Sequence, residues 1–244
     1  MKKEVVKKYK AEFHVHTVYS HDSILTKYFL FLACKIKKLK YIAITDHNEV
    51  KGALKYEKFF KKHGINVIIG EEIFSKDGEI IGLFLNKKIN PGLSAEETIK
   101  EIKKQNGIVY IPHPYDEKRI ETVIKPESLE KIHKDVDLIE CHNGRNIKEE
   151  FSVKQNAIAD KYKITKIIGS DAHTIYEVGR NYCLVNEINR YNLIKEIKNS
   201  EFHKSKCLKI SHKITKIARI IKIVKGGKWN ELSRIINKKL KKNR

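Results

Sequence analysis

The chain has 244 residues, of which 41% are hydrophobic and 33% are charged, so it can bury a core beneath a densely charged surface. This composition excludes collagen-like, prion-like and bulk-disordered chains. The net charge is +21, and +14 of it falls on residues 202–244, where fifteen lysines and arginines face one acid, Glu231. A basic field favours phosphate-bearing partners, but a solvated basic tail without a partner shows the same pattern.

Short apolar runs alternate with helical patterns along the chain. Strands are predicted at 11–16, 41–45, 66–73, 79–85, 108–113, 137–141 and 164–170. Helices are predicted between them at 24–38, 50–63, 94–105, 126–134 and 149–162. Ser94 and Glu97 have the spacing of a capping box, and Asp77-Gly78 is a turn signal between two of the strands.

The repeated order of strand and then helix predicts a parallel sheet, because parallel strands need crossover connections. The predicted strands are short and rich in Ile and Val, as expected when helices cover both faces. An open, doubly wound sheet and a closed barrel both fit this order. The positions of the polar residues favour the barrel.

The predicted strands end repeatedly in residues that can bind a metal. These residues are His14 and His16, Asp46 and His47, Glu71 and Glu72, His113, His142 and Asn143, and Asp171 and His173. In a (β/α) barrel the carboxyl ends of the strands meet at one mouth, where active sites are built. Residues i and i+2 of a strand share a face, so His14 and His16 can grip one site together. A single such pair is more often structural; six strand ends together predict a metal site.

The cysteines and the apolar runs bear on location. Cys34, Cys141, Cys183 and Cys207 form no CxxC pair and suggest no disulfide framework, which fits a reduced compartment. Residues 1–10 are basic, but no apolar signal-peptide core follows them. The most apolar run, 28–34, is too short to span a bilayer. We therefore expect a cytoplasmic protein.

Six sequence blocks together resemble the PHP (polymerase and histidinol phosphatase) domain family. In order, they are HVHTVYSHDS, ITDHN, GEEI, IPHPYD, IECHNGR and GSDAHTIYEVG, spread over residues 14–179. The resemblance covers roughly residues 11–186 and is closest to stand-alone members with an associated C-terminal segment. It implies a distorted seven-stranded (β/α) barrel, here followed by a basic helical C-terminal extension. We expect the barrel in residues 1–201 and the extension in residues 202–244.

The resemblance also implies two or three divalent metal ions, such as manganese, zinc or iron. One ion would be held by His14, His16, Glu72 and Asp171; Glu72 would bridge to a second ion completed by His113 and the His142 region; and Asp22, His47 and His173 would hold a third. Glu72 is preferred to Glu71 because the family's glutamate directly precedes the apolar residue. The choice between His142 and Asn143 stays open. Imidazole and carboxylate ligands suit all three metals, so the ligand set names none of them.

Such a centre predicts a hydrolase that cleaves phosphate esters. Water bound between the ions would lose its proton near neutral pH, and the resulting hydroxide would attack phosphorus in line. Asp46 or His47 could carry protons, although Asp46 could equally orient a ligand. Arg145 is the preferred phosphate clamp, with Arg119 and Arg180 as further candidates; a surface ion pair is the plainer interpretation of each arginine.

Three functions remain open at this point. The leading hypothesis is a phosphoesterase acting on a small phosphorylated metabolite or a nucleotide. The first alternative is a nuclease that acts on DNA or RNA ends and holds the strand through its basic tail. The second alternative is a non-catalytic, metal-stabilised binding module, which the complete ligand set disfavours. The sequence predicts no oligomeric state.

The basic tail shows amphipathic helical spacing. Its apolar positions are Ile210, Ile214, Ile217, Ile221 and Val224, and lysines and Arg219 fill most of the others. Gly226-Gly227 ends this helix, and a second amphipathic stretch carries Trp229, Leu232, Ile236 and Leu240. The tail could pack on the barrel with its lysines in water, which is preferred. It could instead lie on an anionic membrane or bind a nucleic-acid backbone.

Overall fold

The computed structural model describes residues 7–227, so the second amphipathic stretch of the tail lies outside the described residues. The strands are β1 (Tyr9–Val15), β2 (Leu39–Ile44), β3 (Asn66–Ser75), β4 (Gly78–Leu83), β5 (Ile108–Ile111), β6 (Leu138–Asn143), β7 (Thr165–Gly169), β8 (Tyr182–Val185) and β9 (Glu201–His203). The helices are α1 (Lys27–Lys37), α2 (Lys51–Lys62), α3 (Ala95–Lys104), α4 (Pro126–Ile132) with the 3-10 turn η1 (His133–Asp135), α5 (Glu149–Tyr162), α6 (Leu193–Lys198) and α7 (Lys209–Lys225).

Within the described residues the strands form one sheet in the order β7-β6-β5-β4-β3-β2-β1-β8-β9. The pairs β1–β2, β2–β3, β5–β6 and β6–β7 are parallel, while β4 is antiparallel to both of its neighbours. The sheet therefore holds nine strands instead of the seven expected. The two additional strands, β8 and β9, are antiparallel and extend the sheet from the edge of β1.

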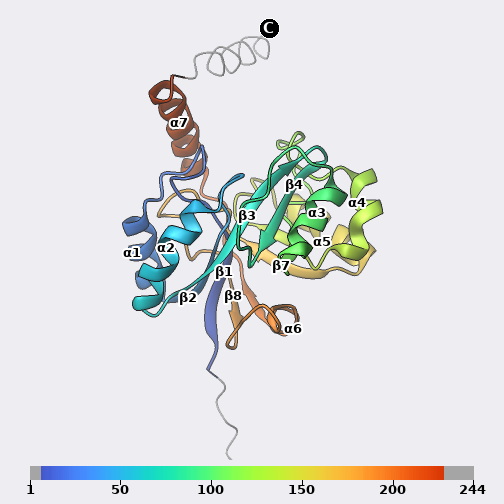
Figure 1. The fold of residues 1–244 in the computed structure, drawn as a ribbon, viewed down its shortest axis with the longest axis horizontal. Helices are drawn as coiled ribbons and strands as arrows, with labels where there is room; N and C mark the ends of the chain where they lie inside the picture. The colour runs from blue at the N-terminus through green and yellow to red at the C-terminus, as the bar shows by residue number, and fades with distance from the viewer. Residues whose placement is uncertain (1–6, 228–244) are drawn as a thin grey trace, which may run out of the picture.

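The sheet curls until β1 meets the segment just beyond β7. Val15 and Ala172 form a parallel bridge, and the His16 amide donates to the Ala172 carbonyl at 2.8 Å. This contact joins the carboxyl ends of β1 and β7 into a nearly closed barrel. The helices cover it on opposite sides, with α1 and α2 on the left of Figure 1 and α3, α4 and α5 on the right.

Three apolar clusters hold these layers together. The first draws side chains such as Phe13, Ala43 and Tyr110 from the strands β1 to β8 and fills the barrel. The second packs α3, α4 and α5 on the outside, and the third packs α1 and α2. Each fully buried Ile, Leu or Phe side chain contributes about 1.5–3 kcal/mol to folding. The four cysteines are all free.

Local signals fix several element boundaries. Ser94 and Glu97 form the expected capping box at the start of α3. Gly78 has a φ of +127°, and a Cβ there would lie 2.5 Å from Cα of Ile124, so only glycine fits the turn between β3 and β4. No helix in residues 7–227 is both long and apolar enough to cross a membrane.

Candidate metal centre

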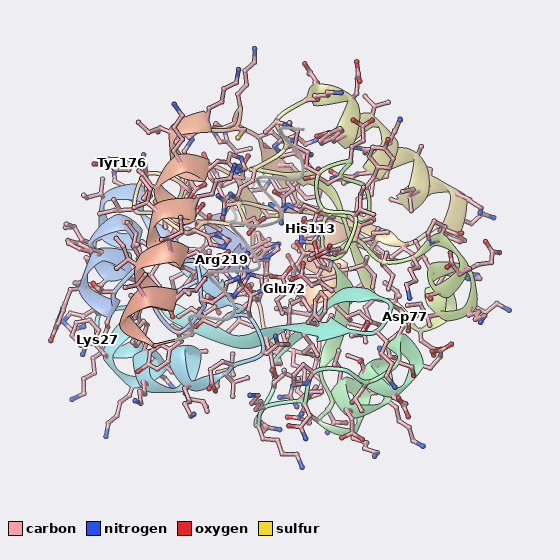
Figure 2. The ribbon with its side chains drawn as sticks, turned by 90° about the horizontal axis from the view of Figure 1, so that it is seen from above. Lys27, Glu72, Asp77, His113, Tyr176 and Arg219 are labelled. Carbon is pink, nitrogen blue, oxygen red and sulfur yellow. The ribbon has the colours of Figure 1, made fainter. Side chains whose placement is uncertain are left out.

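Glu72 lies at the centre of a buried cluster of histidines at the carboxyl ends of the strands. Its Oε1 is 3.1 Å from Nε2 of His113 and 3.4 Å from Nε2 of His14. Its Oε2 is 3.1 Å from Nδ1 of His47 and 3.3 Å from Nε2 of His16. Figure 2 shows Glu72 and His113 close together at the centre of the barrel. One carboxylate thus faces four imidazoles, as expected of a residue that bridges metal ions.

A second carboxylate, Asp171, approaches the same histidines from the other side of β1. Its Oδ1 lies 3.4 Å from Nε2 of His16 and 3.7 Å from Nε2 of His14. The closure of the sheet between β1 and β7 creates this proximity. Asp171 and His113 have φ values of +54° and +27°, left-handed backbone that is strained for non-glycine residues and is found repeatedly at functional sites.

A third group lies nearer the surface, around Asp22. Its carboxylate is 3.2 Å from Nε2 of His173 and 3.7 Å from Nε2 of His47. The neighbouring His21 faces Asp22 at 3.8 Å with 52% of its side chain exposed. Asp22 Oδ1 and His173 Nε2 are buried yet make no hydrogen bond within the described part of the chain. Buried polar atoms nearly always have a hydrogen-bond partner, so two such atoms without one fit the ligands of a cation.

Glu79 joins the cluster although no sequence motif pointed to it. Its carboxylate lies 3.4 Å from Nδ1 of His47 and 3.5 Å from Nε2 of His113. Glu79 is near the start of β4, which is antiparallel and pairs with the end of β3. The beginning of β4 therefore lies at the same end of the barrel as the carboxyl ends of the parallel strands.

Among residues 7–227 the donor atoms gather into five overlapping groups, in each of which they lie within 4.8 Å of one another. The groups are His14, Glu72 and His113; His14, His16 and Asp171; His16, His47 and His173; His47, Glu72 and Glu79; and His21, Asp22 and His47. Eight of the nine predicted metal ligands belong to them. The exception is His142.

Two buried carboxylates outside these groups orient the histidines. Glu140 Oε1 lies 2.7 Å from Nδ1 of His14, and Glu140 Oε2 accepts the His113 amide at 2.7 Å. Asp46 accepts from the Thr17 amide at 2.6 Å and from Ser20 Oγ at 2.8 Å, and Ser20 Oγ is 3.1 Å from Nδ1 of His16. A partner at Nδ1 leaves Nε2 free to face the cluster, as in many metal sites.

The buried charges of the cluster strongly shift one another's pKa values. Burial alone would raise the pKa of Glu72, but His14 and His47 hold it well below its ordinary value. Burial alone would lower the pKa of His14, but Glu72, Glu140 and Asp171 raise it well above its ordinary value. Burial and the charge of Glu72 raise the pKa of Glu79 well above the ordinary value. This set of buried carboxylates and imidazoles fits divalent ions, whose charge would replace the protons.

The geometry of β6 bears on whether His142 or Asn143 borders the cluster. Its pairing with β7 shifts register between Glu140 and His142, and such bulges re-aim the side chains that follow. Asn143 donates to Glu140 at 2.9 Å and lies 3.4 Å from Asp171, whereas His142 Nδ1 faces Ser152 at 2.9 Å. Asn143, not His142, thus borders the cluster, and His142 as a ligand stays a prediction.

The candidate phosphate clamps lie in different surroundings. Arg119 reaches the cluster, with Nη2 2.5 Å from Asp171 Oδ2. The Arg145 side chain is buried, donates to Thr215 of α7 at 2.8 Å and faces Glu177 at 3.5 Å. Arg180 donates to the carbonyl of Lys206 at 3.2 Å. Arg119 is therefore the candidate nearest the metal ligands, and a clamp role for Arg145 stays a prediction.

A nearly closed barrel that gathers buried histidines and carboxylates at the carboxyl ends of its strands defines a metal-site protein. Comparison with known families is consistent with this class. The model of the PHP domain matches residues 12–241. The chain belongs to the PHP domain family.

Similar proteins add the fold but no established activity. Two uncharacterized proteins of Methanocaldococcus jannaschii match: MJ0417 is 36% identical over 183 residues, covering 74% of this chain and 72% of MJ0417. MJ1587 is 44% identical over 116 residues, covering 43% of this chain and 68% of MJ1587.

Two solved structures share the architecture. One is a two-domain protein of Bacteroides vulgatus containing a predicted PHP-like metal-dependent phosphoesterase, with a TM-score of 0.66, 20% identity and 81% of this chain covered. This chain spans only 65% of that protein. The other is PsfC of Pseudomonas syringae, with a TM-score of 0.62, 13% identity and coverage of 88% of this chain and 98% of PsfC. At these identities the likeness shows the fold alone.

Proposed function

We propose that this protein is a metal-dependent hydrolase of phosphate esters, and that its substrate is a small phosphorylated metabolite or a nucleotide. The observation that carries the proposal is the cluster around Glu72, where one carboxylate faces four histidines within 3.4 Å. Membership of the PHP domain family supports it. A complete donor set argues against a binding module that has lost its metals.

The distances between the ligands support an assignment to three sites. His14, His16 and Asp171 would hold one ion. Glu72, Glu79 and His113 would hold a second, and Asp22, His47 and His173 would complete a third site. When bound, divalent ions would supply Lewis acidity toward the phosphate oxygens and lower the pKa of a coordinated water.

The chain's own residues would position the ions and the substrate. Glu140 and the Asp46–Ser20 pair fix the rings of His14 and His16, so that Nε2 of each faces the cluster. Arg119 presents a guanidinium next to Asp171, where its planar donors suit a phosphate group. Burial lowers the pKa of His47 to about 3, so its role here is that of a neutral imidazole ligand, and a proton-carrying role stays a prediction.

The decisive experiment measures phosphate release by the manganese-loaded protein with and without chelator. The panel contains nucleoside monophosphates, sugar phosphates, histidinol phosphate and a short DNA with a terminal phosphate. The variant His14→Ala/His16→Ala should lose bound metal and lose turnover at least about 10³-fold while staying folded. The matched control His63→Ala/His133→Ala changes two histidines distant from the cluster and should keep both. No release from any substrate by fully loaded protein would overturn the proposal.

A nuclease is the second candidate, favoured by the basic helix α7 beside the site. Lys222 of α7 donates to the carbonyls of Ser20 and Ser23, next to Asp22. A basic helix at this position could hold the phosphate backbone of a strand whose end enters the cluster. In the same panel, release confined to the DNA substrate and steeply reduced by salt would favour this candidate.

A further inference from the structure

The helix α7 packs on the barrel mainly through small and polar side chains, together with the buried Ile223. Ser211, Thr215 and Ala218 are buried on this face, and Lys222 donates to the carbonyls of Val18, Ser20 and Ser23 at 2.6–3.0 Å. Thr215 accepts a hydrogen bond from Arg145. These four positions recur every three or four residues and therefore form one side of the helix. The isoleucine face predicted from the sequence is not the face that holds α7 in place.

Most of the apolar side chains of α7 face outward. Ile210, Ile217, Ile220, Ile221 and Val224 are each between 41% and 62% exposed. Four of them, at positions 210, 217, 221 and 224, have the spacing of one continuous helical stripe. A helix of this length extends about 25 Å. Single exposed isoleucines are ordinary, but a stripe running along a helix marks an interaction surface.

The charge of α7 distinguishes between the kinds of partner that could bind its exposed apolar face. The segment Lys209–Lys225 contains no acidic residue, and Lys209, Lys213 and Lys216 are exposed beside the stripe. A second copy packed on this face would bring these cations against their own counterparts. A nucleic acid would neutralise the cations but leave the isoleucines in water. An anionic lipid surface satisfies both, because its interface accepts apolar side chains and its headgroups attract lysine.

We propose that the exposed face of α7 binds the surface of an anionic lipid bilayer, with the helix lying in the plane of the interface. The neighbouring helix α1 lies on the same side of the molecule and is also free of acidic residues. It exposes Tyr28, Phe29, Leu32 and Ile36, each by 48–66%. Because Lys222 ties α7 to the loop that carries Asp22, the bound membrane would lie next to the candidate metal centre. The proposal stands independently of the catalytic one.

The test is flotation of the metal-loaded, full-length protein with lipid vesicles. The protein should float with phosphatidylcholine vesicles that contain phosphatidylglycerol, and not with phosphatidylcholine alone. Ile217→Ala/Ile221→Ala should lower the partition coefficient at least about tenfold, because it removes apolar area from the interface. Alanine preserves helix propensity, so α7 should stay folded. The matched control is Val153→Ala/Tyr191→Ala, which removes two side chains that are 65% and 95% exposed elsewhere.

A second variant, Lys213→Gln/Lys216→Gln, keeps the apolar stripe and removes charge. Its binding should be weaker and less sensitive to salt. Three outcomes would overturn the proposal. The first is that the protein does not float with the vesicles. The second is that the isoleucine variant and its control lose the same amount of vesicle binding. The third is that the protein forms a dimer, which the isoleucine variant does not, while neither the parent protein nor the variant binds vesicles. Binding to duplex DNA that survives the isoleucine change, without vesicle binding, would likewise assign the face to nucleic acid.

Discussion

Glu140 shows how one residue outside the ligand set can control the site. It is fully buried and contacts the His14 ring, the His113 amide and the Asn143 side chain at 2.7–2.9 Å. Its carboxylate fixes which nitrogen of His14 faces Glu72, and burial of that charge is offset by these partners. Such outer partners are commonly as necessary as the ligands themselves.

The substitution Glu140→Gln should weaken metal binding about 10- to 100-fold, because the amide cannot accept from all of these donors at once. Chelator competition with elemental analysis would measure the change. Glu130→Gln, at an exposed glutamate of α4, serves as control and should bind metal normally. Unaltered affinity in Glu140→Gln would show that the His14 ring is held by its packing instead.

Asp77 provides a pH-dependent contribution far from the metal cluster. Burial alone would raise its pKa, but the Ala95 amide, Ser128 and Lys125 hold it below its ordinary value. A lowered folded-state pKa stabilises the fold above the unfolded value of about 4, and this contribution disappears as the pH falls through the folded value. Asp77→Asn should therefore cost about 1 kcal/mol at pH 7 and less at pH 3. Urea unfolding at both pH values measures the difference, and an equal cost at both would contradict the assignment.

At this scale much of the site was predictable. Most of the candidate ligands follow or end buried strands, so their convergence could be expected. These ligands are His14, His16, Glu72, His113, Asp171 and His173. Glu79 begins an antiparallel strand, and Glu140 lies within a strand, so a rule based on strand ends misses both. That Asn143 rather than His142 borders the cluster depends on a bulge, which leaves no signal in a single sequence.

Among the helices and strands, α7 has the clearest effect on a neighbouring loop. Lys222 donates to three carbonyls of residues 18–23, the loop that carries Asp22. Burial lowers the pKa of Lys222, and Asp22 and Asp46 oppose this shift. The helix therefore holds the loop in place, because all three N–H donors of the Lys222 ammonium group bind backbone carbonyl oxygens.

Lys222→Met should loosen this loop and weaken the site of Asp22, His47 and His173 about tenfold, while the ligands around Glu72 keep their ions. Titration calorimetry with manganese would resolve the sites, since only one binding step should change. Lys216→Met, on the exposed side of the same helix, is the control. Equal weakening of every site would mean that the variant disturbs the whole barrel.

The element boundaries followed from local signals where such signals exist. The prediction of a helix at 149–162 agrees with α5, and the capping box of α3 is present. The strands β8 and β9 were not predicted. They are four and three residues long and only partly buried, and they owe their conformation to pairing with β1 and with each other. Long-range pairing of this kind overrides local propensity and leaves little local pattern.

For the whole molecule, the buried cluster makes metal content a determinant of stability. Glu72, Glu79 and Asp171 lie together in the interior, where a divalent ion bound only by the folded state adds free energy by mass action. Manganese at about a thousand times its dissociation constant should stabilise the fold by about 4 kcal/mol, and chelator should remove this gain. Calorimetric melting measures it. His14→Ala/His16→Ala should show little response to metal, and an equal response would place the stabilising ions elsewhere.

The seam between β1 and the residues after β7 also sets the order of assembly. Tyr9, Lys10 and Ala11 pair with residues 183–185, and Val15 pairs with Ala172, so the first strand finds two of its partners more than 150 residues later. Contacts of such separation form late and slow folding. During synthesis the first strand must wait, with one edge unpaired, until the chain beyond residue 185 has left the ribosome. A nascent chain stalled before residue 171 would hold His14 and His16 without Asp171, and would be unable to complete its metal site.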